Sequence, residues 1–106
     1  MTDTDEKTAS LLAAIWQRNR ALVEERLDLL ERAATSAVAG GLIEAQRQEA
    51  GGVAHKMAGS LGMYGYVEGT SIARQIELML LGDGAPDAVR LSALVAELRR
   101  VVFPEG

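Results

Sequence analysis

The stretch that decides the fold is Gly51–Gly65, GGVAHKMAGSLGMYG, which contains the only histidine of the 106-residue chain. Read as a helix at about 100° per residue, this stretch gathers its apolar side chains on one face and turns His55 to the opposite face. The apolar positions are Val53, Met57, Leu61 and Tyr64, with Ala50 and Ala54 beside them. The spacing therefore predicts an amphipathic helix that holds its imidazole in solvent.

Small residues surround this histidine at the spacings of three, four and seven that make helical neighbours. They are Gly51, Gly52, Ala58, Gly59 and Gly62. A glycine inside a helix costs about 0.8–1 kcal/mol relative to alanine, so several glycines in one helix need a reason. Because these residues lie away from the apolar stripe, packing in the core does not supply one. We expect them to form a docking surface that lets a large partner approach His55.

Apolar periodicity and helix breakers predict four helices in one domain spanning residues 1–106. The first runs to the Gly40-Gly41 stop, either as one long helix or as two, with Asn19 marking a kink or a join. Its single tryptophan, Trp16, is expected to anchor packing. The second helix is expected to begin near Leu42 and to end by Gly65. The third is expected from about residue 67 or 70 to 81, and the fourth from Pro86 in its first turn to the stop at Pro104. Short joints between four helices predict an all-α, antiparallel up-down-up-down bundle.

Composition excludes several classes of function. The net charge of −4 and the pI near 4.9 argue against a nucleic-acid binder, which would carry a basic stripe. The chain has no cysteine, so a zinc cluster, a disulfide framework and a thiol nucleophile are all excluded. One histidine without a converging acidic cluster does not make a transition-metal site. No Gly-rich phosphate loop is present, so ATP binding is not expected. Without a signal peptide or an apolar run of about 20 residues, a cytoplasmic protein is expected.

His55, Gly59 and Gly65 stand at spacings of 0, +4 and +10, and an apolar-rich helix ending in SIARQIE (residues 71–77) follows. This pattern resembles the histidine phosphotransfer (HPt) domain. The string AHKMAGSLGMYGY is similar to the phosphoacceptor domains of hybrid sensor kinases and chemotaxis kinases. The motif covers residues 45–80, and the helical pattern covers the rest of the chain.

The resemblance implies that His55 accepts a phosphoryl group on Nε2 and exchanges it with the aspartate of a receiver domain. Histidine suits this chemistry, because its ordinary pKa near 6.5 leaves most rings neutral at pH 7. In the chemotaxis-kinase branch a glutamate near the end of the third-helix motif orients the histidine, and the matching residue here is Glu77. Arg74, one turn earlier, can meet either Glu77 or the phosphoryl oxygens. The alternative is that Arg74 and Glu77 form only an ordinary surface ion pair.

One position departs from the family pattern. The family places a lysine one turn after the histidine, where it neutralises the phosphoryl group, and this chain has Ala58 there. Lys56 directly follows His55 and lies about 100° round the helix. We expect Lys56 or Arg74 to supply the missing positive charge.

The expected partners are a response-regulator receiver domain, a histidine kinase, or both, with no nucleic acid and no membrane. The resemblance implies a monomeric phosphocarrier of two-component signalling, and no enzyme. It needs no cofactor of its own, because Mg²⁺ belongs to the receiver. Two alternatives stay open. One is a non-phosphorylated binding module that docks to and inhibits a receiver or a kinase, and the other is a helical dimerisation bundle.

Overall fold

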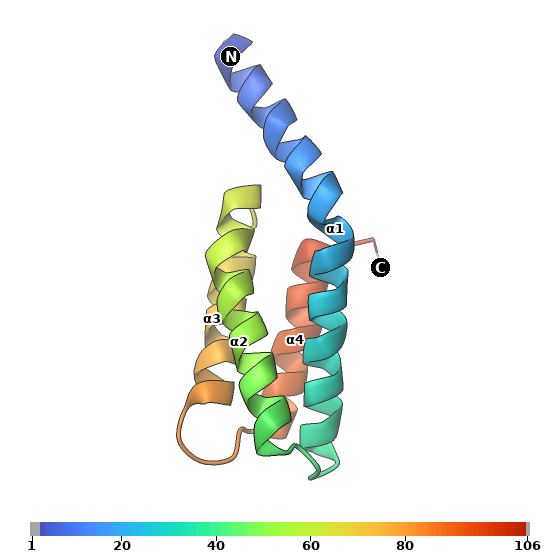
Figure 1. The fold of residues 1–106 in the computed structure, drawn as a ribbon, viewed down its shortest axis with the longest axis vertical. Helices are drawn as coiled ribbons and strands as arrows, with labels where there is room; N and C mark the ends of the chain where they lie inside the picture. Colours follow the sequence, from blue (N-terminus) through green and yellow to red (C-terminus); the bar gives the residue numbers. More distant parts are fainter. Residues whose placement is uncertain (1–2, 106) are drawn as a thin grey trace.

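A computed structural model describes residues 3–105 of the chain, with side chains from residue 5 onward, as four α-helices and one short 3-10 helix. The elements are α1 (Asp3–Val38), α2 (Glu44–Ser60), η1 (Leu61–Tyr64), α3 (Val67–Leu81) and α4 (Ala88–Val102). The four α-helices run alternately down and up the molecule, and short joints connect them (Figure 1). The prediction of an all-α four-helix bundle is confirmed.

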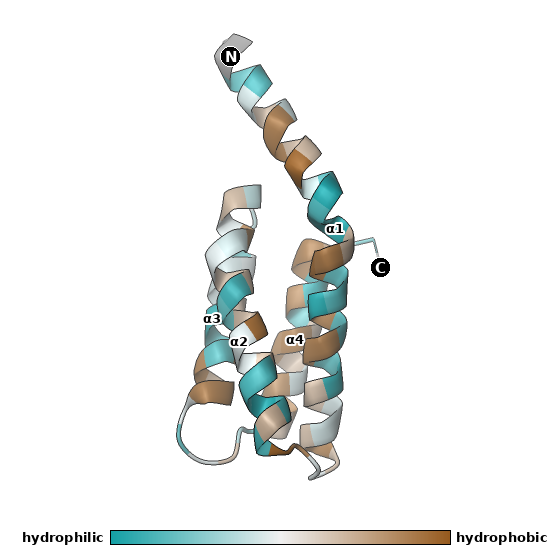
Figure 2. Ribbon diagram, viewed as in Figure 1, coloured by the Kyte–Doolittle hydropathy of each residue, from teal (hydrophilic) through white to brown (hydrophobic). Residues whose placement is uncertain are grey.

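The first helix is continuous, which decides between the two alternatives left by the sequence. In α1, the amide nitrogen Nδ2 of Asn19 donates a hydrogen bond to the backbone carbonyl of Ile15 at 2.8 Å. Side chains that bond back to the preceding turn often bend a helix without ending it. Figure 1 shows α1 changing direction and its N-terminal part projecting beyond the other helices. This projecting part carries a hydrophobic band (Figure 2), in which Leu11 is 57% exposed. None of the helices in the described part of the chain combines the length and the apolar character that a membrane span requires.

The second helix lies within its predicted bounds. It begins at Glu44 and ends at Ser60, and the next four residues form the tighter turn η1. The helix thus begins near residue 42 and ends before Gly65, as predicted, but its last turn is the 3-10 helix η1, which the periodicity did not indicate. Gly65 ends η1 with a φ of 92°, a left-handed conformation that glycine adopts without strain.

The third helix begins at Val67, the earlier of its two predicted starts, and ends at Leu81 as expected. The fourth begins later than predicted, because Asp87 caps it. The Asp87 side chain accepts a hydrogen bond from the backbone N–H of Arg90 at 3.1 Å. Pro86 consequently precedes the cap, and its expected place in the first turn is wrong. A carboxylate satisfies a free amide of the first turn, which proline at the cap position could not do.

The core between the four helices is aliphatic, and no polar side chain within residues 5–105 is buried in it. The largest fully buried side chains are Leu27, Leu30, Met57, Leu61, Ile76, Leu80, Leu91, Val95, Leu98 and Val102.

All four aromatic residues of the chain meet at one end of the bundle. The Trp16 ring centroid lies 5.3 Å from that of Tyr64, 5.1 Å from that of Tyr66 and 5.8 Å from that of Phe103. This aromatic cluster (Trp16, Tyr64, Tyr66 and Phe103) joins α1 to η1 and to the end of α4. Trp16 is therefore a packing anchor, as its place in the sequence predicted.

Candidate functional site

His55 lies in the middle of α2, with its side chain 72% exposed, and among residues 5–105 it pairs with one charged group. Its Nδ1 lies 2.5 Å from Oε2 of Glu77 on α3, whose side chain is 18% exposed. A carboxylate oxygen can only accept, so Nδ1–H donates this hydrogen bond. In the neutral ring Nε2 then carries a lone pair and no proton. The site is thus an imidazole in one tautomer, held from one side and open to solvent.

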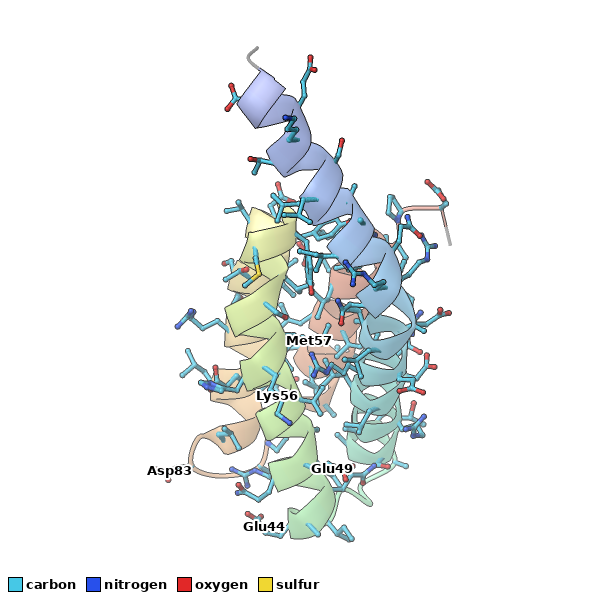
Figure 3. The ribbon with its side chains drawn as sticks, turned by 45° about the horizontal axis from the view of Figure 1, so that its top comes forward. Glu44, Glu49, Lys56, Met57 and Asp83 are labelled. Carbon is cyan, nitrogen blue, oxygen red and sulfur yellow. The ribbon has the colours of Figure 1, made fainter. Side chains whose placement is uncertain are left out.

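The outward position of this imidazole follows from the apolar side chains around it. Ala50, Ala54, Met57 and Leu61 are fully buried, and they fall on one face of α2 and of the turn that follows it. His55 is on the other side of the helix, as the sequence predicted. Figure 3 shows the contrast for two neighbouring residues: Met57 points into the bundle, whereas Lys56 projects from the outer surface of α2.

Three of the five predicted docking residues leave open surface near the histidine. A Cβ added at Gly52 or Gly59 would meet nothing within 4 Å. Gly62 is exposed, although an added Cβ would approach Oγ1 of Thr70 at 3.1 Å. These three glycines, Gly52, Gly59 and Gly62, are called the open glycines below.

The other two predicted docking residues are buried, so their assignment to an exposed surface is wrong. Ala58 is only 6% exposed, and Gly51 is buried as well. Both lie on the flank of α2 that α3 covers. The apolar periodicity of α2 identified the core face, but it contained no information on which flank the neighbouring helix would cover.

The close approach at Gly51 is the tightest contact between these two helices at a glycine. A Cβ added to Gly51 would overlap Cδ2 of Leu81. Gly51 is one turn before His55 on α2, and Leu81 is one turn after Glu77 on α3. The two helices are therefore antiparallel here, and a step along one is matched by an equal step back along the other. Leu81 follows Glu77 by four residues and so lies on the same face of α3, a spacing from which its place beside α2 could have been predicted.

This register places Arg74 across from Ala58. Ala58 comes three residues after His55, and Arg74 comes three residues before Glu77. Arg74 is exposed, and within residues 5–105 it forms no ion pair. Of the alternatives left open for Arg74, an ion pair with Glu77 is not formed, and Glu77 binds the imidazole instead.

Lys56 is also exposed and also lacks an ion pair among the described residues. It stands on the side of α2 turned away from α3, as Figure 3 shows, and so does not share the flank on which Glu77 reaches His55. Of the two predicted cationic residues, Arg74 alone lies on the helix that contacts the imidazole.

Comparison with known proteins gives one match. The family model described as "Hpt domain" matches residues 14–102, which is most of the chain. No curated protein and no solved structure matches it.

Proposed function

The chain belongs to the Hpt domain family, and from that premise we propose that it is a phosphorelay carrier that accepts a phosphoryl group on Nε2 of His55. Domains of this family carry out histidine phosphotransfer and are phosphocarriers rather than enzymes. The observation that carries the proposal is the exposed imidazole whose Nδ1 is bound to Glu77 at 2.5 Å. The hydrogen bond leaves the lone pair of Nε2 directed away from the carboxylate.

In the proposed step, the phosphoryl donor is an aspartyl phosphate of a receiver domain. The lone pair of Nε2 attacks phosphorus and forms the N–P bond, while the bond between phosphorus and the aspartyl oxygen breaks. The aspartate leaves as a carboxylate with the electron pair. The imidazole becomes positively charged, and the Glu77 carboxylate at Nδ1 stabilises that charge. The reverse reaction returns the phosphoryl group by the same path.

The phosphoryl oxygens need positive charge nearby, because charge-assisted hydrogen bonds to them are about twice as strong as neutral ones. We assign this role to Arg74 in preference to Lys56. Arg74 stands across from Ala58, the position at which the family has a lysine. Its guanidinium can donate two parallel hydrogen bonds to a phosphoryl group, which an ammonium does not do. Mg²⁺ would be supplied by the receiver.

The open glycines are proposed to be the place where the receiver docks. They flank His55 along α2 and η1, and at Gly52 and Gly59 an added Cβ would meet nothing within 4 Å. Gly59→Trp should fill that space and block phosphoryl transfer, while circular dichroism should show unchanged helicity. Gly41→Trp, at the far end of the bundle, is the matched control. Normal transfer to Gly59→Trp would contradict this docking surface.

The direct experiment incubates the protein with a panel of phosphorylated receiver domains and follows the label. Transfer to the wild type, with a label stable in base and labile in acid, is expected of a phosphohistidine, and His55→Gln should take up none. Phosphoryl lifetime in Arg74→Ala and Lys56→Ala then tests the assigned charge, because only Arg74→Ala should change it. If His55→Gln still binds the receiver and the wild type never becomes labelled, the non-phosphorylated binding module is the better description. The alanine at position 58 favours that second function.

A further inference from the structure

We infer that Gly51 is a positioning residue, which sets the distance at which Glu77 holds Nδ1 of His55. It does so by allowing α3 to approach α2 at Leu81, one helical turn away from the imidazole. The role assigned to Gly51 in phosphoryl transfer rests on the proposed function. Its effect on the histidine ring does not, because the ring is held in the same way without a phosphoryl donor.

The geometry leaves no room for a side chain at this position. A Cβ at Gly51 would overlap Cδ2 of Leu81 and lie 2.6 Å from its Cγ, far below the separation of carbon atoms in contact. The next glycine, Gly52, has nothing within 4 Å of the same added atom. Two adjacent glycines therefore differ completely in what they face, and only Gly51 lies between the helices.

A Cβ at position 51 would force the Leu81 side chain out of its present position. Its Cγ changes place only if the first side-chain torsion rotates, and a helix permits two of the three staggered positions. The backbone next to it is also tied to α2. Nε of Arg47 donates to the carbonyl of Leu80 at 2.5 Å, and another nitrogen of the same guanidinium donates to the carbonyl of Gly82. Because Arg47 holds this end of α3, a side chain at position 51 should act as a wedge between the helices.

A wedge at position 51 would lengthen the hydrogen bond between His55 and Glu77, one turn away. The contact between Nδ1 of His55 and Oε2 of Glu77 is short at 2.5 Å, and it joins the two helices directly. Hydrogen bonds weaken steeply as distance and angle depart from their optimum. When this bond lengthens, the ring loses its preference for a proton on Nδ1. A fraction of the molecules then carries the proton on Nε2, where it blocks attack on phosphorus.

The experiment reads the tautomer of the single histidine by ¹⁵N NMR at a pH where the ring is neutral. The variants are Gly51→Ala and Gly51→Leu, and the matched controls are Gly52→Ala and Gly52→Leu. A third variant, Gly51→Ala combined with Leu81→Ala, removes the atoms that the new Cβ would meet. Leu81 is 41% exposed, so this truncation should leave the core intact. Circular dichroism verifies that each variant is folded.

The ratio of Nδ1–H to Nε2–H tautomer should fall about tenfold in Gly51→Ala, the size expected when a charge-assisted hydrogen bond is lost. The Gly52 variants should match the wild type, and Leu81→Ala should restore the ratio in the double variant. An unchanged ratio in Gly51→Ala, or no restoration by Leu81→Ala, would overturn the inference. If Gly51→Leu fails to fold, Gly51→Ala decides. If the variants show these ratios but the wild-type protein accepts no phosphoryl group, the proposed function is wrong and the positioning role of Gly51 still holds.

Discussion

The second and fourth helices are of similar length, but they meet the rest of the bundle in opposite ways. The buried residues of α2 are Ala50, Gly51, Ala54, Met57 and Ala58. Those of α4 are Leu91, Leu94, Val95, Leu98 and Val102. Four of the five on α2 are no larger than alanine, whereas all five on α4 are valine or leucine. Small residues let a neighbouring helix approach closely, and large ones bury more apolar area. The molecule thus separates a helix that positions a functional group from a helix that stabilises the fold.

The largest effect is expected from a change in the core of α4, which should lower stability without affecting the site on α2. Leu98 is completely buried, so Leu98→Ala should lower the free energy of unfolding by about 2–5 kcal/mol through lost burial and the cavity it leaves. Urea denaturation followed by circular dichroism measures the loss. The fraction that remains folded should still accept a phosphoryl group at the wild-type rate. A slowed transfer at full folding would show that α4 takes part in the site.

The complementary change is Glu77→Gln, which removes the charge at the imidazole and keeps the shape. Phosphoryl transfer to His55 should slow about 10- to 100-fold, because hydrogen bonds to charged groups contribute more than neutral ones. The free energy of unfolding should change by about 1 kcal/mol or less, since His55 is exposed and the glutamine oxygen can still accept its hydrogen bond. Single-turnover transfer and urea denaturation together test this. Equal transfer rates in the variant and the wild type would remove Glu77 from the site.

A smaller effect is expected where α4 ends in the aromatic cluster. Phe103→Leu keeps an apolar side chain but removes the ring that faces Trp16 at 5.8 Å and carries the guanidinium of Arg20 at 4.9 Å. The free energy of unfolding should fall by about 0.5–1.5 kcal/mol. Trp16 is the only tryptophan, so its fluorescence reports the change directly. An unaltered emission spectrum would mean that the cluster does not hold α1 to the end of α4.

The smallest effect concerns the ion pairs that join α4 to α1. Nε of Arg99 lies 2.5 Å from Oε1 of Glu31, and an Arg99 Nη lies 2.7 Å from Oδ1 of Asp28. Partial burial lowers the pKa of Arg99, but its hydrogen bonds to Glu31 and Asp28 outweigh this and leave the pKa raised, so the guanidinium stays charged. Arg99→Gln should cost only about 0.2–1 kcal/mol because these groups are partly solvated. The difference in the free energy of unfolding between the variant and the wild type should shrink in 1 M NaCl. A difference that does not shrink would point to packing by the arginine stem.

The family and the exposed position of His55 were predictable because both follow from local spacing in the sequence. Residues three and four apart are neighbours on any helix, so the apolar positions around His55 determined which way its ring faces. Glu77 was predicted by resemblance alone, since a contact between residues 22 apart in sequence leaves no periodic trace. Periodicity did not indicate the 3-10 turn that follows α2, and it misplaced Pro86 because the side chain of Asp87 caps α4.

By itself the sequence determined four amphipathic helices and one histidine that faces water, because helical geometry ties side-chain direction to spacing. Only the tertiary structure decided which flank of α2 is covered by α3. That choice buried Gly51 and Ala58, left Gly52 and Gly59 open, and brought a carboxylate to Nδ1. The reason is physical: two helices settle at the distance and register that their contacting side-chain volumes permit, and those volumes come from separate parts of the chain.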